Sequence, residues 1–308
     1  MVRNPNAVLP VGTKIVIQTK ILDSSGEMLF APGAVGIIIK APLENNYPYR
    51  IRFVDGYEES LKRTQFEIHS HYQLQGIEEH ETDVESLYDY VIYRCIIGSR
   101  AYGLDDENSD IDIRGIYIPP ADLHWSIYGV PEQLENQETE EQYWEVQKFL
   151  ILALKANPNI LECLYTPLIR DTSPLAEELL AIREVFLSKL VYQTYNGYVL
   201  SQFRKLKKDI ENYGEIRWKH AMHLIRLLLS GKIALKEHYI PVRVDDYRDA
   251  LLTIKRGEMP WEEVDAWRLQ LHREFDVAFA STTLSERPDY ERASAFLIKA
   301  RRSMVEKS

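Results

Sequence analysis

Apolar and polar residues alternate over short distances in the first quarter of the chain. Between residues 8 and 72 the alternating runs are separated by turn signals such as Pro32-Gly33 and Asp55-Gly56. Period-two alternation between such turns is typical of short β-strands. We therefore predict a small β-barrel of the SH3-like type over residues 1–75. A module of this kind is more often a docking or packing domain than a catalytic one.

The next stretch predicts an α/β domain over residues 80–174. The apolar run Val91–Ile97 is typical of a buried strand, Ser109–Ile118 alternates, and residues 142–146 form a third candidate strand. A helical pattern then runs from Phe149 to Lys155 and stops before Asn157-Pro158, where a helix is expected to end.

From residue 175 to 308 the apolar positions recur at helical spacing, most clearly in residues 199–210, 218–232 and 266–279. This pattern predicts a C-terminal helical domain. The complete chain is thus expected to be a multi-domain α+β protein.

The charge of the chain is unevenly distributed. The net charge is -10, which argues against a protein coated in basic surface for long duplexes. Residues 76–150 carry 4 basic and 18 acidic side chains, whereas residues 151–308 carry 25 and 22. An acidic segment fits a site that collects divalent cations, although a solvated acidic surface explains the same count.

Targeting and redox signals are few. Two cysteines, Cys95 and Cys163, both lie in apolar surroundings and form neither a disulfide framework nor a metal-binding spacing. The chain has no uninterrupted apolar run long enough to span a membrane and no signal-peptide pattern at Met1. We therefore expect a cytoplasmic protein without membrane association.

Candidate chemistry is concentrated in the sequence Gly98-Ser99-Arg100-Ala101-Tyr102-Gly103, followed after five residues by Ser109-Asp110-Ile111-Asp112. Two carboxylates two residues apart on an extended segment point to the same side of a sheet. They repel each other and are most stable with a divalent cation between them, such as Mg²⁺ or Mn²⁺. Ile111 and Ile113 are then expected to face the core.

The glycine-serine turn is the expected phosphate site. At Gly98 and Ser99, backbone N–H groups and a hydroxyl can approach phosphate oxygens because side-chain bulk is missing. Arg100 and Ser109 add possible contacts. A triphosphate beside the two aspartates is the arrangement required for metal-dependent nucleotidyl transfer. Each part alone is common, and the specific signal is their joint occurrence in this order.

The segment GSRAYG…SDIDIRGIYIPP resembles the signature of the polymerase-beta-type nucleotidyltransferases. The longer pattern, with Lys148-Phe149, Asn157-Pro158-Asn159 and the segment from Lys219 to Arg226, resembles the RlaP-like family linked to RNA repair, over roughly residues 84–300. The resemblance implies transfer of a nucleoside monophosphate from an NTP to a hydroxyl, with Mg²⁺ or Mn²⁺. It implies no particular acceptor.

The resemblance also implies a third carboxylate on a later strand, as general base and metal ligand. An aspartate is expected there, but the chain has glutamates, and counting back from Lys148-Phe149 favours Glu140, with Glu141 next. Helical domains after this fold often supply cations to the triphosphate. Lys219 and Arg226 are candidates for that role, although basic residues on an amphipathic helix are commonly a solvated face.

Three functions stay open at this point. The first is nucleotidyl transfer to an RNA end, tRNA-like or damaged, for which the basic run Arg204-Lys205-Leu206-Lys207-Lys208 offers phosphate contacts. The second is AMP transfer to a protein hydroxyl. The third is a catalytically silent nucleotide-binding or docking module, which is favoured if no glutamate replaces the missing aspartate.

Overall fold

The computed structural model describes residues 8–22, 25–42, 44, 47–78, 84–107, 109–214 and 216–305. The chain divides into two compact units, Met1–Thr82 and Asp83–Ser308. Within the described residues, no helix is both long enough and apolar enough to cross a membrane.

The first unit is built on antiparallel strands, as the alternating pattern predicts. Five of them form a sheet in the order β6-β5-β4-β1-β7. In β5 the side chains alternate strictly between buried and exposed, so that Tyr49, Ile51 and Phe53 enter the core of this unit. The elements are β1 (Lys14–Ile17), β2 (Ile21–Leu22), β3 (Met28–Phe30), β4 (Val35–Lys40), β5 (Tyr49–Phe53), β6 (Glu58–Leu61), η1 (Arg63–Gln65), β7 (Phe66–Ile68) and α1 (His69–Glu78).

The closed SH3-like barrel is not confirmed. In the described part of the unit, β6 and β7 each have a single partner and form the two edges of the sheet, while β2 and β3 pair only with each other. Alternation along a strand determines which face is buried, but not whether the edge strands meet. The helix α1 follows β7 and was not predicted.

The second unit contains a mixed sheet in the order β10-β11-β9-β8-β12. Strand β11 runs parallel to β9, and the other neighbours are antiparallel. The bounds are β8 (Val91–Ile97), β9 (Asp112–Tyr117), β10 (Gln133–Asn136), β11 (Glu141–Glu145) and β12 (Ile169–Thr172). The three strands predicted for this region are therefore present, although the second begins three residues later than the alternation indicates.

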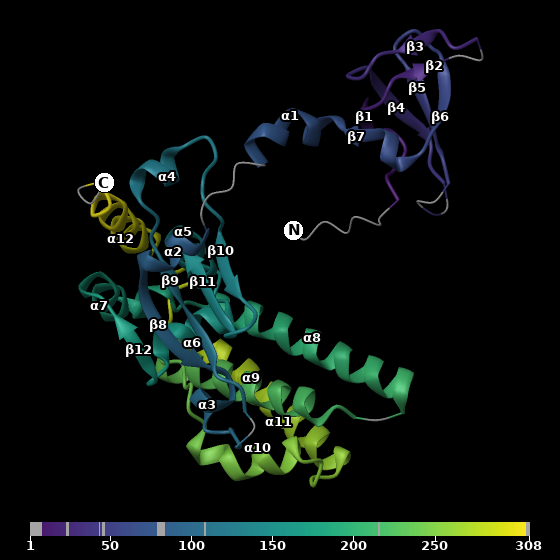
Figure 1. The fold of residues 1–308 in the computed structure, drawn as a ribbon. Helices are drawn as coiled ribbons and strands as arrows, with labels where there is room; N and C mark the ends of the chain where they lie inside the picture. The colour runs from purple at the N-terminus through teal and green to yellow at the C-terminus, as the bar shows by residue number, and fades with distance from the viewer. Residues whose placement is uncertain are drawn as a thin grey trace. The chain divides into compact units, whose positions relative to one another are not determined.

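Several helices contact this sheet, and further helices follow along the chain as far as Arg302 (Figure 1). Both α8 and α11 lie along α9. The bounds are α2 (Val84–Leu87), η2 (Tyr88–Tyr90), α3 (Gly98–Tyr102), α4 (Ala121–Trp125), α5 (Val146–Leu154), α6 (Pro158–Tyr165), α7 (Pro174–Ala181), η3 (Arg183–Phe186), α8 (Leu190–Tyr213), α9 (Trp218–Glu237), η4 (Asp245–Tyr247), α10 (Arg248–Lys255), α11 (Trp261–Ser281) and α12 (Tyr290–Arg302).

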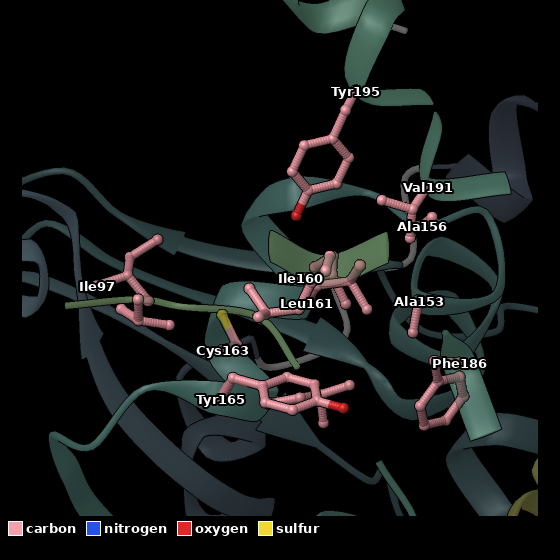
Figure 2. Packing of buried hydrophobic residues seen from close by; sticks show 14 of the residues in the cluster. Ile97, Ala153, Ala156, Ile160, Leu161, Cys163, Tyr165, Phe186, Val191 and Tyr195 are labelled. Atoms are coloured by element: carbon pink, nitrogen blue, oxygen red, sulfur yellow. The ribbon is translucent and has the colours of Figure 1, made fainter. Parts of the chain in front are cut away.

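One hydrophobic core joins the sheet to these helices. It contains Ile97 from β8, Leu161 and Cys163 from α6, and Tyr195 from α8, all of them buried (Figure 2). The core continues through α9 to Phe275 of α11. Because sheet and helices share this core, the end of β8 and the face of α9 are held together, and the candidate site lies between them.

Candidate active site

A cleft of about 420 Å³ opens where β8 ends, bordered by α3, β9, β11, α6, α9 and α10. Six residues predicted from the sequence line it: Gly98, Ser99, Ser109, Asp110, Asp112 and Lys219. Glu140, Arg100 and Arg226 are not among its lining residues. The two halves of the sequence motif therefore meet in one cavity.

The close approach of Gly98 to Asp112 determines this geometry. The antiparallel register of β8 and β9 pairs Ile97 with Asp112. Gly98 has φ +75°, and a Cβ at this position would overlap the carboxylate of Asp112. Glycine is required here both for the left-handed backbone and for the space that the carboxylate occupies.

The two aspartates differ in their surroundings. Asp112 is the first residue of β9 and is partly exposed, whereas Asp110 lies in the preceding loop and is exposed. Ile113 is buried as predicted, but Ile111 is 43% exposed, so the prediction that it faces the core is wrong. The reason is that regular strand geometry starts only at Asp112, and the alternation does not extend back to Ile111.

Arg100 stabilises the loop that carries the aspartates. Its guanidinium donates to the backbone carbonyl oxygens of Ser109, at 2.8 Å, and Asp110, at 3.3 Å. The Ser109 hydroxyl in turn accepts from the backbone N–H of Asp106, at 2.9 Å. Arg100 therefore positions Asp110 through the backbone of its loop. These contacts do not support the predicted contact of Arg100 with phosphate.

Arg114 forms an ion pair with Asp112. One of its terminal nitrogens lies 3.1 Å from Oδ1 of Asp112, and the other donates to the carbonyl oxygens of Ile113 and Glu140, at 2.8 Å each. The Arg114 side chain is 19% exposed and lines the cleft. The β9–β11 register places Gln142 directly opposite Arg114, and Gln142 lines the cleft as well.

Glu140 occupies a different position from the one predicted. It lies in the turn before β11 with φ +53°, and its side chain is exposed. Together with Glu141 it lines an adjoining hollow of about 380 Å³, with Arg114 and Gln142 at the border between this hollow and the cleft. The left-handed backbone interrupts the alternation that would turn Glu140 toward Asp112. The prediction of Glu140 as the third carboxylate is therefore not supported by its placement.

Helices α9 and α10 form a helical wall of the cleft. Its nitrogen-bearing side chains are Lys219, His223 and Lys255. Lys255 donates to the carbonyl oxygen of Leu104 and pairs with Asp106, each at 3.1 Å. Burial, together with the positive charges of Arg226 and Lys219, lowers the pKa of His223 to about 3. His223 is therefore a neutral imidazole at pH 7.

Arg226 lies beneath the cleft. Its side chain is 5% exposed, and it donates to Oε1 of Glu162 at 2.6 Å. The hydroxyl of Tyr102 donates to Oε2 of the same carboxylate at 2.6 Å, and the Arg226 guanidinium stacks 3.7 Å from the centre of the Tyr102 ring. Burial raises the pKa of Tyr102 well above its usual range, which keeps it a donor. Arg226 does not line the cleft and its charge is paired with Glu162, so its placement gives no support to the nucleotide-binding role predicted for it.

Several lining residues were not predicted. Arg114 lies inside the recognised motif, two residues after Asp112. Its charge and this spacing could have identified it as a residue of the site. Asn159 belongs to the recognised segment Asn157-Pro158-Asn159, in which Asn157 caps α6, but it was not assigned to the site. Gln142 and Lys255 carry no local signal, because they reach the cleft only through strand register and helix packing.

The set of groups that could hold a cation is small. In the part of the chain that the structure describes, no group of three or more His, Cys, Asp or Glu side chains is arranged to hold a metal ion. Asp110 and Asp112 supply two carboxylates on one cleft. Mg²⁺ is commonly bound through one or two carboxylates together with substrate phosphates, so this pair fits a cation delivered with a nucleotide.

Comparison with known proteins adds a family assignment. Residues 67–299 match the family described as "RlaP: RNA repair pathway DNA polymerase beta family". The match begins in β7 and ends in α12, and so includes the complete cleft. Over 156 residues the chain is 28% identical to "Uncharacterized protein YcgL" of Bacillus subtilis (strain 168), an alignment that covers 49% of this chain and 58% of that protein.

Proposed function

The chain belongs to the RlaP family, the RNA repair pathway DNA polymerase beta family, and from this premise we propose that it is a nucleotidyltransferase. It transfers a nucleoside monophosphate from an NTP to a hydroxyl group of an RNA end, with Mg²⁺ or Mn²⁺. The observation that carries the proposal is that Gly98, Ser99, Asp110 and Asp112 line one cleft, with the Asp112 carboxylate against Gly98.

The residues that line the cleft have different roles in this reaction. Gly98 and Ser99 offer backbone N–H groups and a hydroxyl to the phosphates. Lys219 is exposed on the helical wall of the cleft and would contact the same phosphates. Asp110 and Asp112 would hold the divalent cation, which when bound would neutralise phosphate charge and lower the pKa of the acceptor hydroxyl.

The reaction is an in-line displacement at the α-phosphorus. The acceptor oxygen forms a bond to this phosphorus, and the bond from phosphorus to the oxygen bridging to the β-phosphate breaks. The hydroxyl proton passes to solvent and pyrophosphate leaves. The cleft contributes mainly by positioning the two substrates and by stabilising charge, which is the main protein contribution in phosphoryl transfer.

RNA is the favoured acceptor because of the family description and the surface of α8. Arg204, Lys205 and Lys208 are exposed on this helix, and α9, which follows it, carries Lys219 into the cleft. Lysine and arginine on such a surface contact a nucleic-acid backbone through its phosphates. The proposal also places the enzyme in the cytoplasm, where Cys95 and Cys163 stay reduced; both are buried free thiols.

The deciding experiment is a labelling assay with the full chain. Each α-³²P-labelled NTP is incubated with Mg²⁺ or Mn²⁺, total RNA and cell lysate, and the labelled macromolecule is identified. Label in RNA supports the proposal, and label in protein supports AMP transfer to a protein hydroxyl instead. NTP binding without any label identifies a silent nucleotide-binding module.

The matched control is the double variant Asp110→Asn/Asp112→Asn. It is expected to lower the labelling rate by at least about a thousandfold while the protein stays folded, because both cation ligands are lost together. Labelling that survives in this variant would refute the site.

A further inference from the structure

The border between the cleft and the hollow lined by Glu140 is formed by the guanidinium of Arg114 and the side-chain amide of Gln142. Arg114 and Gln142 face each other across β9 and β11 and line both cavities. A nucleotidyltransferase site with three carboxylates would need an acid on this wall. Among the described residues, the acids that line the cleft are Asp106, Asp110 and Asp112, none of which belongs to β11.

The guanidinium of Arg114 occupies the side of Asp112 that faces β11. It donates to Oδ1 of Asp112 at 3.1 Å and to the carbonyl oxygen of Glu140. Arg114 therefore connects β9 to the turn before β11. A permanent positive charge at this distance competes with a divalent cation for the same carboxylate.

From these contacts we infer that the cleft holds one divalent cation at Asp110 and Asp112, and that Arg114 takes the place of a second cation. Gln142, as the uncharged residue opposite Arg114, leaves this wall without a third carboxylate. The inference rests on the proposed function and specifies its metal requirement. On this inference Arg114 is a catalytic residue, because it lines the cleft beside Asp112 and its charge would act on phosphates bound there.

Binding of Mn²⁺ alone tests the inference without requiring turnover. Free Mn²⁺ is measured by electron paramagnetic resonance during titration of the full-length protein. One Mn²⁺ per chain is expected, with binding lost in Asp112→Asn and unchanged in Glu140→Gln. Two ions in the wild type, or weaker binding in Glu140→Gln, overturns the inference and leaves the proposed function standing.

The other outcomes of the titration are equally decisive. If Mn²⁺ binds but Asp110→Asn and Asp112→Asn do not change its affinity, the proposed function fails together with the inference. If the wild type binds no Mn²⁺, the inference alone is overturned, and the labelling assay decides the proposed function.

Arg114→Gln gives a result that a structural role of Arg114 would not produce. Removal of the competing charge is expected to tighten Mn²⁺ binding about tenfold, while labelling falls at least about tenfold because charge stabilisation is lost. A purely structural arginine would weaken both. Arg114→Lys, which keeps the charge, is expected to retain the wild-type Mn²⁺ affinity and part of the labelling, so that a folding defect of one variant does not decide the result.

Two further variants complete the design. Gln142→Glu adds the missing carboxylate and is expected to tighten Mn²⁺ binding about tenfold. Arg94→Gln is the control for removal of an arginine from the sheet, since Arg94 lies on the neighbouring strand, bonds the Tyr143 hydroxyl and does not line the cleft. Tighter Mn²⁺ binding in Arg94→Gln as well would show a general effect of charge and overturn the assignment to Arg114.

Discussion

The two walls of the cleft are built in different ways. The wall of β8, α3 and β9 takes Gly98, Ser99 and Asp112 from one short stretch of sequence, placed by backbone conformation and strand register. The helical wall takes Lys219 from α9 and Lys255 from α10, far apart in sequence. The first wall depends on local geometry and the second on buried long-range contacts, so different substitutions should damage them.

The largest expected effect concerns the network beneath the helical wall. Arg226→Met leaves the Glu162 carboxylate, which is 1% exposed, with the Tyr102 hydroxyl as a donor but without its charged partner, and is expected to lower the free energy of unfolding by about 3–5 kcal/mol. Urea denaturation followed by circular dichroism measures this change. The control is Arg226→Met/Glu162→Met, which removes both charges and should lose less than the single variant. A double variant as unstable as the single one would contradict this explanation.

The first wall should be damaged by a single methyl group. Gly98→Ala places a Cβ on the Asp112 carboxylate and is expected to reduce labelling about a hundredfold, since small displacements of reacting groups are costly. Gly129→Ala is the matched control, because Gly129 also has positive φ, at +66°, but has no heavy atom within 4 Å of an added Cβ. Both variants carry a strain of about 1–2 kcal/mol. Equal labelling in the two would show that strain alone matters.

The same difference between the walls explains how far the sequence can be interpreted. The meeting of Gly98 with Asp112 was predictable because an apolar strand, a turn and an alternating strand follow one another along the chain. Helical spacing puts Lys219 and Arg226 on one face of α9, but it does not tell that Lys219 is exposed while Arg226 is buried against Tyr102 and Glu162. Glu140 was predicted from the family resemblance and from its spacing to Lys148-Phe149, and neither indicates that Glu140 itself has a left-handed backbone.

His223 provides a prediction about pH for the helical wall. Its folded pKa of about 3 lies below the unfolded value of about 6.5, so the unfolded chain binds the proton more tightly. The contribution of the neutral His223 to the free energy of unfolding is therefore fully present above about pH 6.5. This contribution is lost as the pH falls below that value, by at most about 1.4 kcal/mol per pH unit. Besides Arg226 and Lys219, the charges of His220 and Lys255 act in the same direction.

The variant His223→Gln isolates this contribution. Unfolding free energies measured at pH 7, 6 and 5 should fall less steeply in the variant than in the wild type. Parallel curves would show that other groups cause the acid sensitivity, and that His223 is not held neutral by its position.

The smallest effect is expected at Glu140, and it tests the boundary between the two cavities. Its side chain is exposed, and only its backbone carbonyl reaches the site, through Arg114. Glu140→Gln keeps that backbone contact and should change labelling by less than about twofold and stability by less than about 0.5 kcal/mol. Labelling at saturating NTP and at low NTP measures kcat and kcat/KM separately. A tenfold loss of kcat would mean that Arg114 leaves Asp112 when nucleotide binds and that Glu140 turns in to replace it, which would make the wall of β11 part of the catalytic apparatus.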